Sequence, residues 1–331
     1  FLLTAVPNWT GTKPGQSWIV AGLAALWLSG RVAILFSGEL PATLVLVVDI
    51  AFLPVLGVNI FLNLLKRPKP QNLIFLGLLA MMTAANLTVH LEWTGFTTGT
   101  ATGGLRLGLL TLGALICILG GRITPGFTKN AMVRDGIETD LPRSRGWVDA
   151  IGVFSAVLLA LLVAFVPIDY TGGTLLGVIA LVAALSNASR LSGWRTRAIL
   201  NQPILWSLHL GFAMLCIGYG ALAIHWFGLG LSMATALHII AIGAVGGMTL
   251  AVMSRAALGH TGRPLIVSRP IVLAYAMVAL AAVVRSVGVF LAPDYYFSMM
   301  FLAGALWIAG FVIFIAVYAP ICMAPRLQKA D

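Results

Sequence analysis

Charged residues are scarce in this sequence, which excludes the ordinary class of soluble globular domains. Only 9% of the 331 residues are charged, whereas 60% are hydrophobic. A soluble domain carries about 25% charged residues because its surface must be hydrated. Long apolar runs recur from one end of the chain to the other. The composition therefore predicts an all-α protein, a polytopic bundle of transmembrane helices.

Cysteines are few and nucleotide-binding motifs are missing. The three cysteines, Cys117, Cys216 and Cys322, are far apart and form no CxxC pair, so we expect no disulfide framework. The sequence holds no Walker motif and no GxGxxG after a strand, which leaves ATP-driven transport unsupported. The formal net charge is +10. Its placement between apolar segments indicates membrane topology rather than a nucleic-acid partner.

Ten apolar segments are close to the ~20 residues that a membrane-spanning helix needs. They are predicted at residues 17–37, 41–64, 72–91, 103–123, 147–166, 170–190, 203–224, 229–253, 268–291 and 294–320. The first residues, FLLTAVPNWTG, read as the last turns of a further helix, so we expect the sequence to be truncated at its N-terminus. We interpret residues 1–331 as one transmembrane domain, with a cytoplasmic loop at 124–146.

Lys and Arg residues occur at alternate connections between these segments. The other connections carry Glu39, Glu92, Asp169 and Asp294, and no basic residue. The positive-inside rule places the basic connections in the cytoplasm. We therefore expect a multi-pass membrane protein, in contact with the lipid bilayer, whose C-terminus is cytoplasmic.

Four ionisable residues, Arg31, Asp49, Arg106 and Arg285, fall inside the predicted spans, all in the outer half of the membrane. Charged groups at this depth are costly and usually face an interior site. Guanidinium groups suit paired carboxylates such as haem propionates. We interpret the four residues as a polar pocket, with Arg106 and Arg285 holding propionates. In the alternative interpretation, each arginine reaches the headgroups or pairs with Asp49 or Glu92.

Two histidines lie within consecutive apolar spans: His209 in PILWSLHLGF and His238 in LSMATALHIIAIG. We expect them to be neighbours, because their estimated depths differ by only ~7 Å. Neutral imidazole is a good ligand for iron and for copper. Two such residues in a chain with five histidines favour a metal or haem site over simple packing. The histidines alone do not separate haem iron from copper.

Two motifs mark helix exits on the cytoplasmic side. In GGRITPGFTKN, Gly120 and Gly121 are expected to end a helix, with Arg122 binding its terminal carbonyls. In SRAALGHTGRP, His260 lies far from the outer pocket. We expect His260 to order a loop; a proton relay and a second ligand set are the alternatives. The two motifs are predicted to pack together, and their candidate polar residues are Arg122, Asn130, Arg255 and Arg263.

Five segments resemble the NnrS family, in matching order over essentially the whole chain. They are FLLTAVPNWTG, ANLTVHLEWTG, GGRITPGFTKN, PILWSLHLGF and LHIIAIGAVGGMTLAVMSRAALGHTGRPL. These are bacterial inner-membrane proteins that contain haem, and for which copper is described. The resemblance implies haem b and copper as cofactors, and twelve spans, two of which are missing here. It also implies a histidine-rich segment before residue 1, and metal-ligand roles for His90, His209, His238 and His260.

The family is linked to nitric oxide metabolism and to protection against nitrosative stress. The resemblance therefore predicts a haem-dependent redox protein that reduces or detoxifies nitric oxide or a nitrosylated metal species. Its electron donor and its catalytic residues are left open. One alternative is a non-catalytic haem sensor or electron-transfer protein. Another is a secondary transporter, although the sequence shows no clear internal repeat and no paired broken helices.

Overall fold

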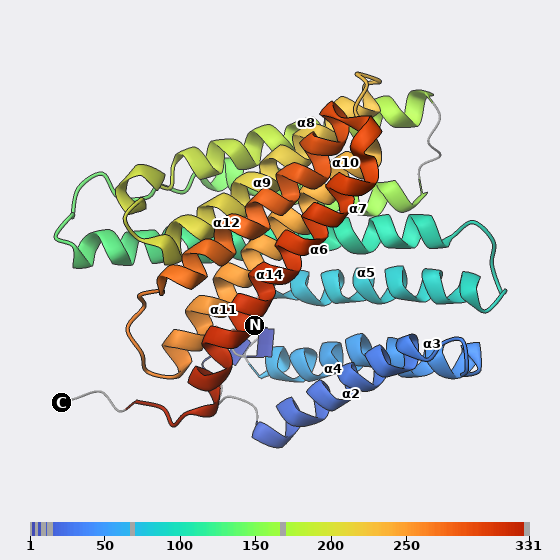
Figure 1. The fold of residues 1–331 in the computed structure, drawn as a ribbon, viewed down its shortest axis with the longest axis horizontal. Coiled ribbons are helices and arrows are strands. Elements are labelled where there is room, and N and C mark those ends of the chain that lie inside the picture. Colours follow the sequence, from blue (N-terminus) through green and yellow to red (C-terminus); the bar gives the residue numbers. More distant parts are fainter. Residues whose placement is uncertain are drawn as a thin grey trace. The chain divides into compact units, whose positions relative to one another are not determined.

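The computed structural model describes residues 2–3, 6–7, 11, 16–66, 70–165 and 170–327. Every regular element in this part of the chain is helical (Figure 1). Ten of its helical segments are long and apolar enough to cross a membrane, which confirms the number predicted from the sequence. The expectations for Asp169 and for most of residues 1–11 lie outside the described residues.

The helices gather in two compact units. Unit 1 comprises residues 1–111 and 160–165, and unit 2 comprises residues 112–159 and 166–331. Helices α6 (Ala101–Arg134) and α7 (Gly146–Phe165) contribute residues to both units.

Unit 1 contains four further helices. They are α2 (Ser17–Leu35), α3 (Ala42–Ile50), α4 (Phe52–Leu65) and α5 (Pro70–Trp93). Helices α3 and α4 form one span that is interrupted at Ala51. Pro54 explains the break, because it has no N–H to donate to the carbonyl of Ile50.

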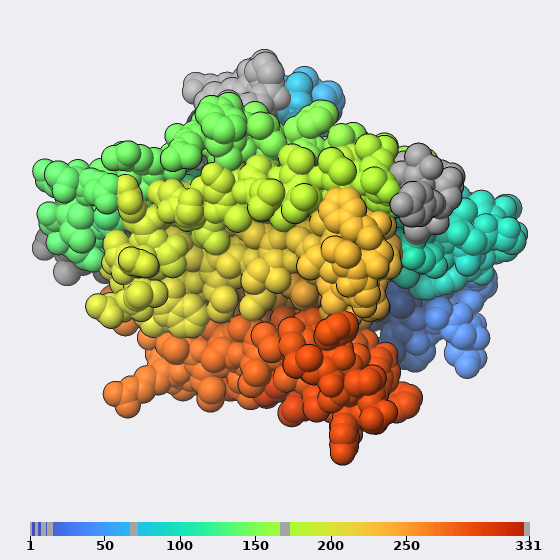
Figure 2. Space-filling view, turned by 90° about the horizontal axis from the view of Figure 1, so that it is seen from above, coloured from blue at the N-terminus to red at the C-terminus, as the bar shows by residue number. Residues whose placement is uncertain are grey.

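Unit 2 holds the remaining elements. They are α8 (Tyr170–Ser192), η1 (Thr196–Ile199), α9 (Pro203–Trp226), α10 (Met233–His238), η2 (Ile239–Gly246), α11 (Gly247–His260), α12 (Arg269–Val283), η3 (Val284–Gly288), α13 (Val289–Leu291), η4 (Pro293–Tyr295) and α14 (Tyr296–Met323). Segments η2 and η3 are π-helical insertions within spans. Helix α9 packs against α8, η2 and α11, while α12 packs against α14. In Figure 2 the colours run across one face from the lime of α8 through the yellow of α9 and a gold segment to the orange and red of α12 and α14.

Helix α6 corrects the prediction that Gly120 and Gly121 end a helix. It continues through both glycines and through Pro125 as far as Arg134. The predicted loop at 124–146 is therefore helical in its first half. Both glycines have side chains of other helices where their own Cβ atoms would lie. Their role is to let neighbours approach the backbone of α6 closely, rather than to terminate it.

Candidate functional site

Asp49 of α3 is the centre of a buried polar cluster in unit 1. Only 2% of its side chain is exposed. Its carboxylate accepts hydrogen bonds from Asn86 Nδ2 at 2.8 Å and from His90 Nε2 at 3.0 Å, and it pairs with Arg31. Gly30 allows this approach, since a Cβ atom there would lie 2.9 Å from Asp49 Oδ1. The structure thus gives Arg31 the partner named by the alternative interpretation, Asp49.

The other two arginines of the predicted polar pocket, Arg106 and Arg285, lie elsewhere in the chain. Arg106 is half-buried on the part of α6 that belongs to unit 1. Arg285 lies in η3 of unit 2, where its guanidinium is 5.5 Å from the ring centre of Tyr296. Their roles as propionate ligands stay predictions.

His238 ends α10 immediately before the π-helical segment η2. Its Nδ1 lies 2.5 Å from the carbonyl oxygen of Ala234, so Nδ1 carries the proton and donates it. In the part of the chain that the structure describes, Nε2 has no hydrogen-bonding partner. Its lone pair is therefore free to bind a metal. π-Helical insertions of this kind occur frequently at functional sites.

His209 has a different environment, because both of its ring nitrogens are engaged. Nε2 lies 2.9 Å from the hydroxyl of Thr128, and Nδ1 lies 2.8 Å from that of Thr196. The indole ring of Trp194 meets the imidazole edge to face, with 5.9 Å between the ring centres. His209 also lines an open cavity of about 360 Å³ whose other walls are mostly apolar. To bind a metal, His209 would have to release one of the two threonine hydroxyls.

His209 and His238 are not neighbours, contrary to the expectation from the sequence. The reason is the way in which α9 is aligned with the span formed by α10, η2 and α11. Gly218 lies opposite Ile240, and Gly211 lies opposite Met248. His238 is therefore level with a position two residues beyond Gly218, roughly 16 Å along α9 from His209. At this separation the two imidazoles do not share one metal ion. Among the described residues there is also no cluster of three or more His, Cys, Asp or Glu side chains.

The motifs GGRITPGFTKN and SRAALGHTGRP pack together, as the sequence predicts. The guanidinium of Arg255 lies 3.9 Å from the ring centre of Phe127. His260 is exposed at the end of α11, and Arg263 Nη1 reaches the carbonyl oxygen of Thr261 at 3.5 Å. Arg122 and Asn130 lie on the exposed side of α6. The functional roles of all these polar residues stay predictions.

The comparison with known families decides which group of proteins this one belongs to. A family model described as NnrS protein matches residues 1–326, which is essentially the whole chain. The chain belongs to the NnrS family. That family is linked to the nitric oxide response, so the protein has a general role related to nitric oxide. Neither a curated protein nor a solved structure matches the chain.

Haem, which the NnrS family implies, can be tested against these histidines. An axial ligand needs an unprotonated ring nitrogen, and a hydrogen bond from the other nitrogen usually orients it. His238 fits both requirements, because Nδ1 donates to a backbone carbonyl and Nε2 has no hydrogen-bonding partner among the described residues. His209 does not fit while both threonine hydroxyls contact it. Copper binding stays a prediction for this NnrS protein.

A second buried network escaped the sequence analysis. Arg190 of α8 lies 2.5 Å from Asp149 Oδ1 of α7, 2.7 Å from Asn187 Oδ1 and 3.1 Å from the carbonyl oxygen of Cys117 on α6. Only 4% of its side chain is exposed. The sequence feature that could have revealed this network is the spacing of Asn187 and Arg190, which are three residues apart and therefore lie on one face of the helix.

Proposed function

We propose that this protein is a haem b protein of the bacterial inner membrane that reduces or detoxifies nitric oxide or nitrosylated metal species. Membership of the NnrS family supports the role in the nitric oxide response. The free Nε2 of His238 supports an axial haem ligand.

One packing relationship supports the proposal most directly. Segment η3, which carries Arg285, packs against α10, which ends at His238. A haem group needs an axial ligand for its iron and cations for its two propionates. In unit 2, the candidate axial ligand His238 and the candidate propionate partner Arg285 therefore lie in adjacent segments.

The contribution of each residue follows from its contacts. When bound, haem supplies an iron that binds nitric oxide and exchanges electrons with it. The hydrogen bond to Ala234 holds the His238 ring in the tautomer that coordinates a metal. Arg285 offers its guanidinium to a carboxylate, and its contact with Tyr296 restrains the side chain. Nitric oxide is small and apolar, so it can reach such a site from the bilayer.

The test is an absorption spectrum of the purified protein in its oxidised form, its reduced form, and its reduced form with nitric oxide. We expect a Soret band that shifts when nitric oxide is added. His238→Ala is expected to lose the haem. His225→Ala is the matched control, because His225 Nδ1 likewise lies 2.8 Å from a backbone carbonyl, that of Leu231. This control variant should keep the haem.

Each outcome separates the candidate functions. A normal haem content in His238→Ala would show that the ligand assignment is wrong. A haem spectrum that does not respond to nitric oxide would favour electron transfer, and the absence of a Soret band would favour the transporter. Catalytic consumption of nitric oxide, with reductant supplied, separates a reductase from a sensor.

A further inference from the structure

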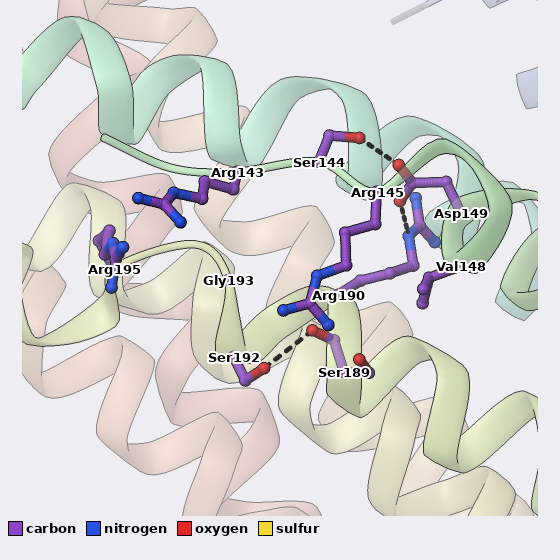
Figure 3. Close-up of a pocket in the computed structure, with 10 residues that line it drawn as sticks. All are labelled: Arg143, Ser144, Arg145, Val148, Asp149, Ser189, Arg190, Ser192, Gly193 and Arg195. Atoms are coloured by element: carbon purple, nitrogen blue, oxygen red, sulfur yellow. Dashed lines mark hydrogen bonds and ion pairs between the residues drawn. The ribbon is translucent and has the colours of Figure 1, made fainter. Parts of the chain in front are cut away.

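A cavity of about 160 Å³ in unit 2 is lined by arginine and serine side chains. It lies where α7 begins and α8 ends, and it is separate from His209 and His238. Its lining includes the side chains of Arg143, Ser144, Arg145, Ser189, Arg190 and Arg195 (Figure 3).

Positive charge exceeds negative charge around this cavity. Arg190 pairs with Asp149 inside it, and Arg195 and Arg143 both pair with Asp140. Within the described residues, no acidic side chain pairs with Arg145. Four arginines thus face two aspartates, and the excess charge is positive.

One buried donor at the cavity has no acceptor among the described residues. The Nε atom of Arg195 is buried and has no hydrogen-bonding partner. A buried donor without a partner is costly, so it indicates an acceptor that is not part of the described residues. Figure 3 shows the side chain of Arg145 extending across the cavity toward Ser189 and Ser192. An oxyanion beside Arg145 would accept from its guanidinium and from the hydroxyl of Ser189 together.

The position of the cavity along the membrane normal narrows the choice of anion. Spans Gly146–Phe165 and Gly173–Ser192 both have an end at the cavity. Trp147, next to the cavity, is 69% exposed. Exposed tryptophans at span ends mark the level of the lipid headgroups. Phosphate groups are abundant at that level, and basic pockets at span ends bind them.

We infer that this cavity binds a phosphate group, held by Arg145, Arg195 and the hydroxyl of Ser189. The phosphate belongs to an anionic phospholipid headgroup or to a small soluble phosphate. Asp149 does not prevent binding, because Arg190 and the hydroxyl of Ser144 already occupy its two oxygens. The inference is independent of haem binding.

The experiment compares the protein with Arg145→Gln and with Arg197→Gln. Arg197 is exposed in η1, two residues beyond Arg195, and does not line the cavity, so it is a control with the same change of charge. Thermal unfolding in detergent is measured against inorganic phosphate at constant ionic strength. Retained lipid is counted by native mass spectrometry after extraction from nanodiscs of phosphatidylglycerol or of phosphatidylcholine.

We expect Arg145→Gln to weaken phosphate or phosphatidylglycerol binding by about tenfold, the loss typical of one charge-assisted contact. Arg197→Gln should bind like the wild type. Stabilisation by inorganic phosphate would identify a soluble ligand. Selective retention of phosphatidylglycerol without that stabilisation would identify a lipid headgroup. Equal binding by both variants, or no binding by the wild type, would overturn the inference.

Discussion

Gly121 of α6 lies directly against the guanidinium of Arg190, where a Cβ atom would clash with Nη2. The missing side chain is what lets Arg190 reach the carbonyl oxygen of Cys117, one turn earlier on the same helix. Three spans are joined at this point, since Asp149 comes from α7 and Arg190 from α8. The glycine therefore has a packing role, and α6 continues through it.

Gly121→Ala tests this packing directly. We expect it to displace Arg190 and to destabilise the protein by about 1–3 kcal/mol, the usual cost of overpacking. Gly126→Ala is the control on the same helix, because no atom lies within 4 Å of its Cβ position. That variant should be neutral, or stabilised by up to about 1 kcal/mol. Thermal unfolding in detergent measures both, and equal effects would contradict the packing role.

Asp49→Ala tests the polar cluster of unit 1. The substitution removes the acceptor of His90 and Asn86, whose buried donors would be left without a partner. We expect a loss of about 1–3 kcal/mol in unfolding free energy. Glu39→Ala, an exposed acid at the α2–α3 connection, should change stability by less than about 0.5 kcal/mol. Equal melting temperatures for the two variants would show that the cluster contributes little.

The predicted propionate roles of Arg106 and Arg285 have an electrochemical consequence that can be measured. Removing a cation beside the propionates favours the more positive, oxidised iron. Arg106→Ala and Arg285→Ala should therefore lower both the midpoint potential and the haem affinity. Arg269→Ala is the control, because Arg269 is exposed at the other end of the span that carries Arg285. Potentials and affinities that match the wild type in both variants would exclude propionate contacts.

The sequence was least informative where two distant segments meet. It placed Asp49 and Arg31 as charges inside the predicted spans, but it left open whether they pair with each other or face a ligand. The structure pairs them, because Gly30 brings α2 close to α3. The sequence likewise could not place His209 relative to His238, because the alignment of two packed helices depends on contacts such as that of Gly218 with Ile240.

The sequence by itself determined the ten spans and the scarcity of charge within them, because the length and hydropathy of a segment are local properties. It also located the family motifs, which are contiguous. Only the tertiary structure decided the partners of Arg190, the continuity of α6 through Gly121 and the free Nε2 of His238. These features depend on which helix faces pack together, and packing joins residues that are far apart in the chain.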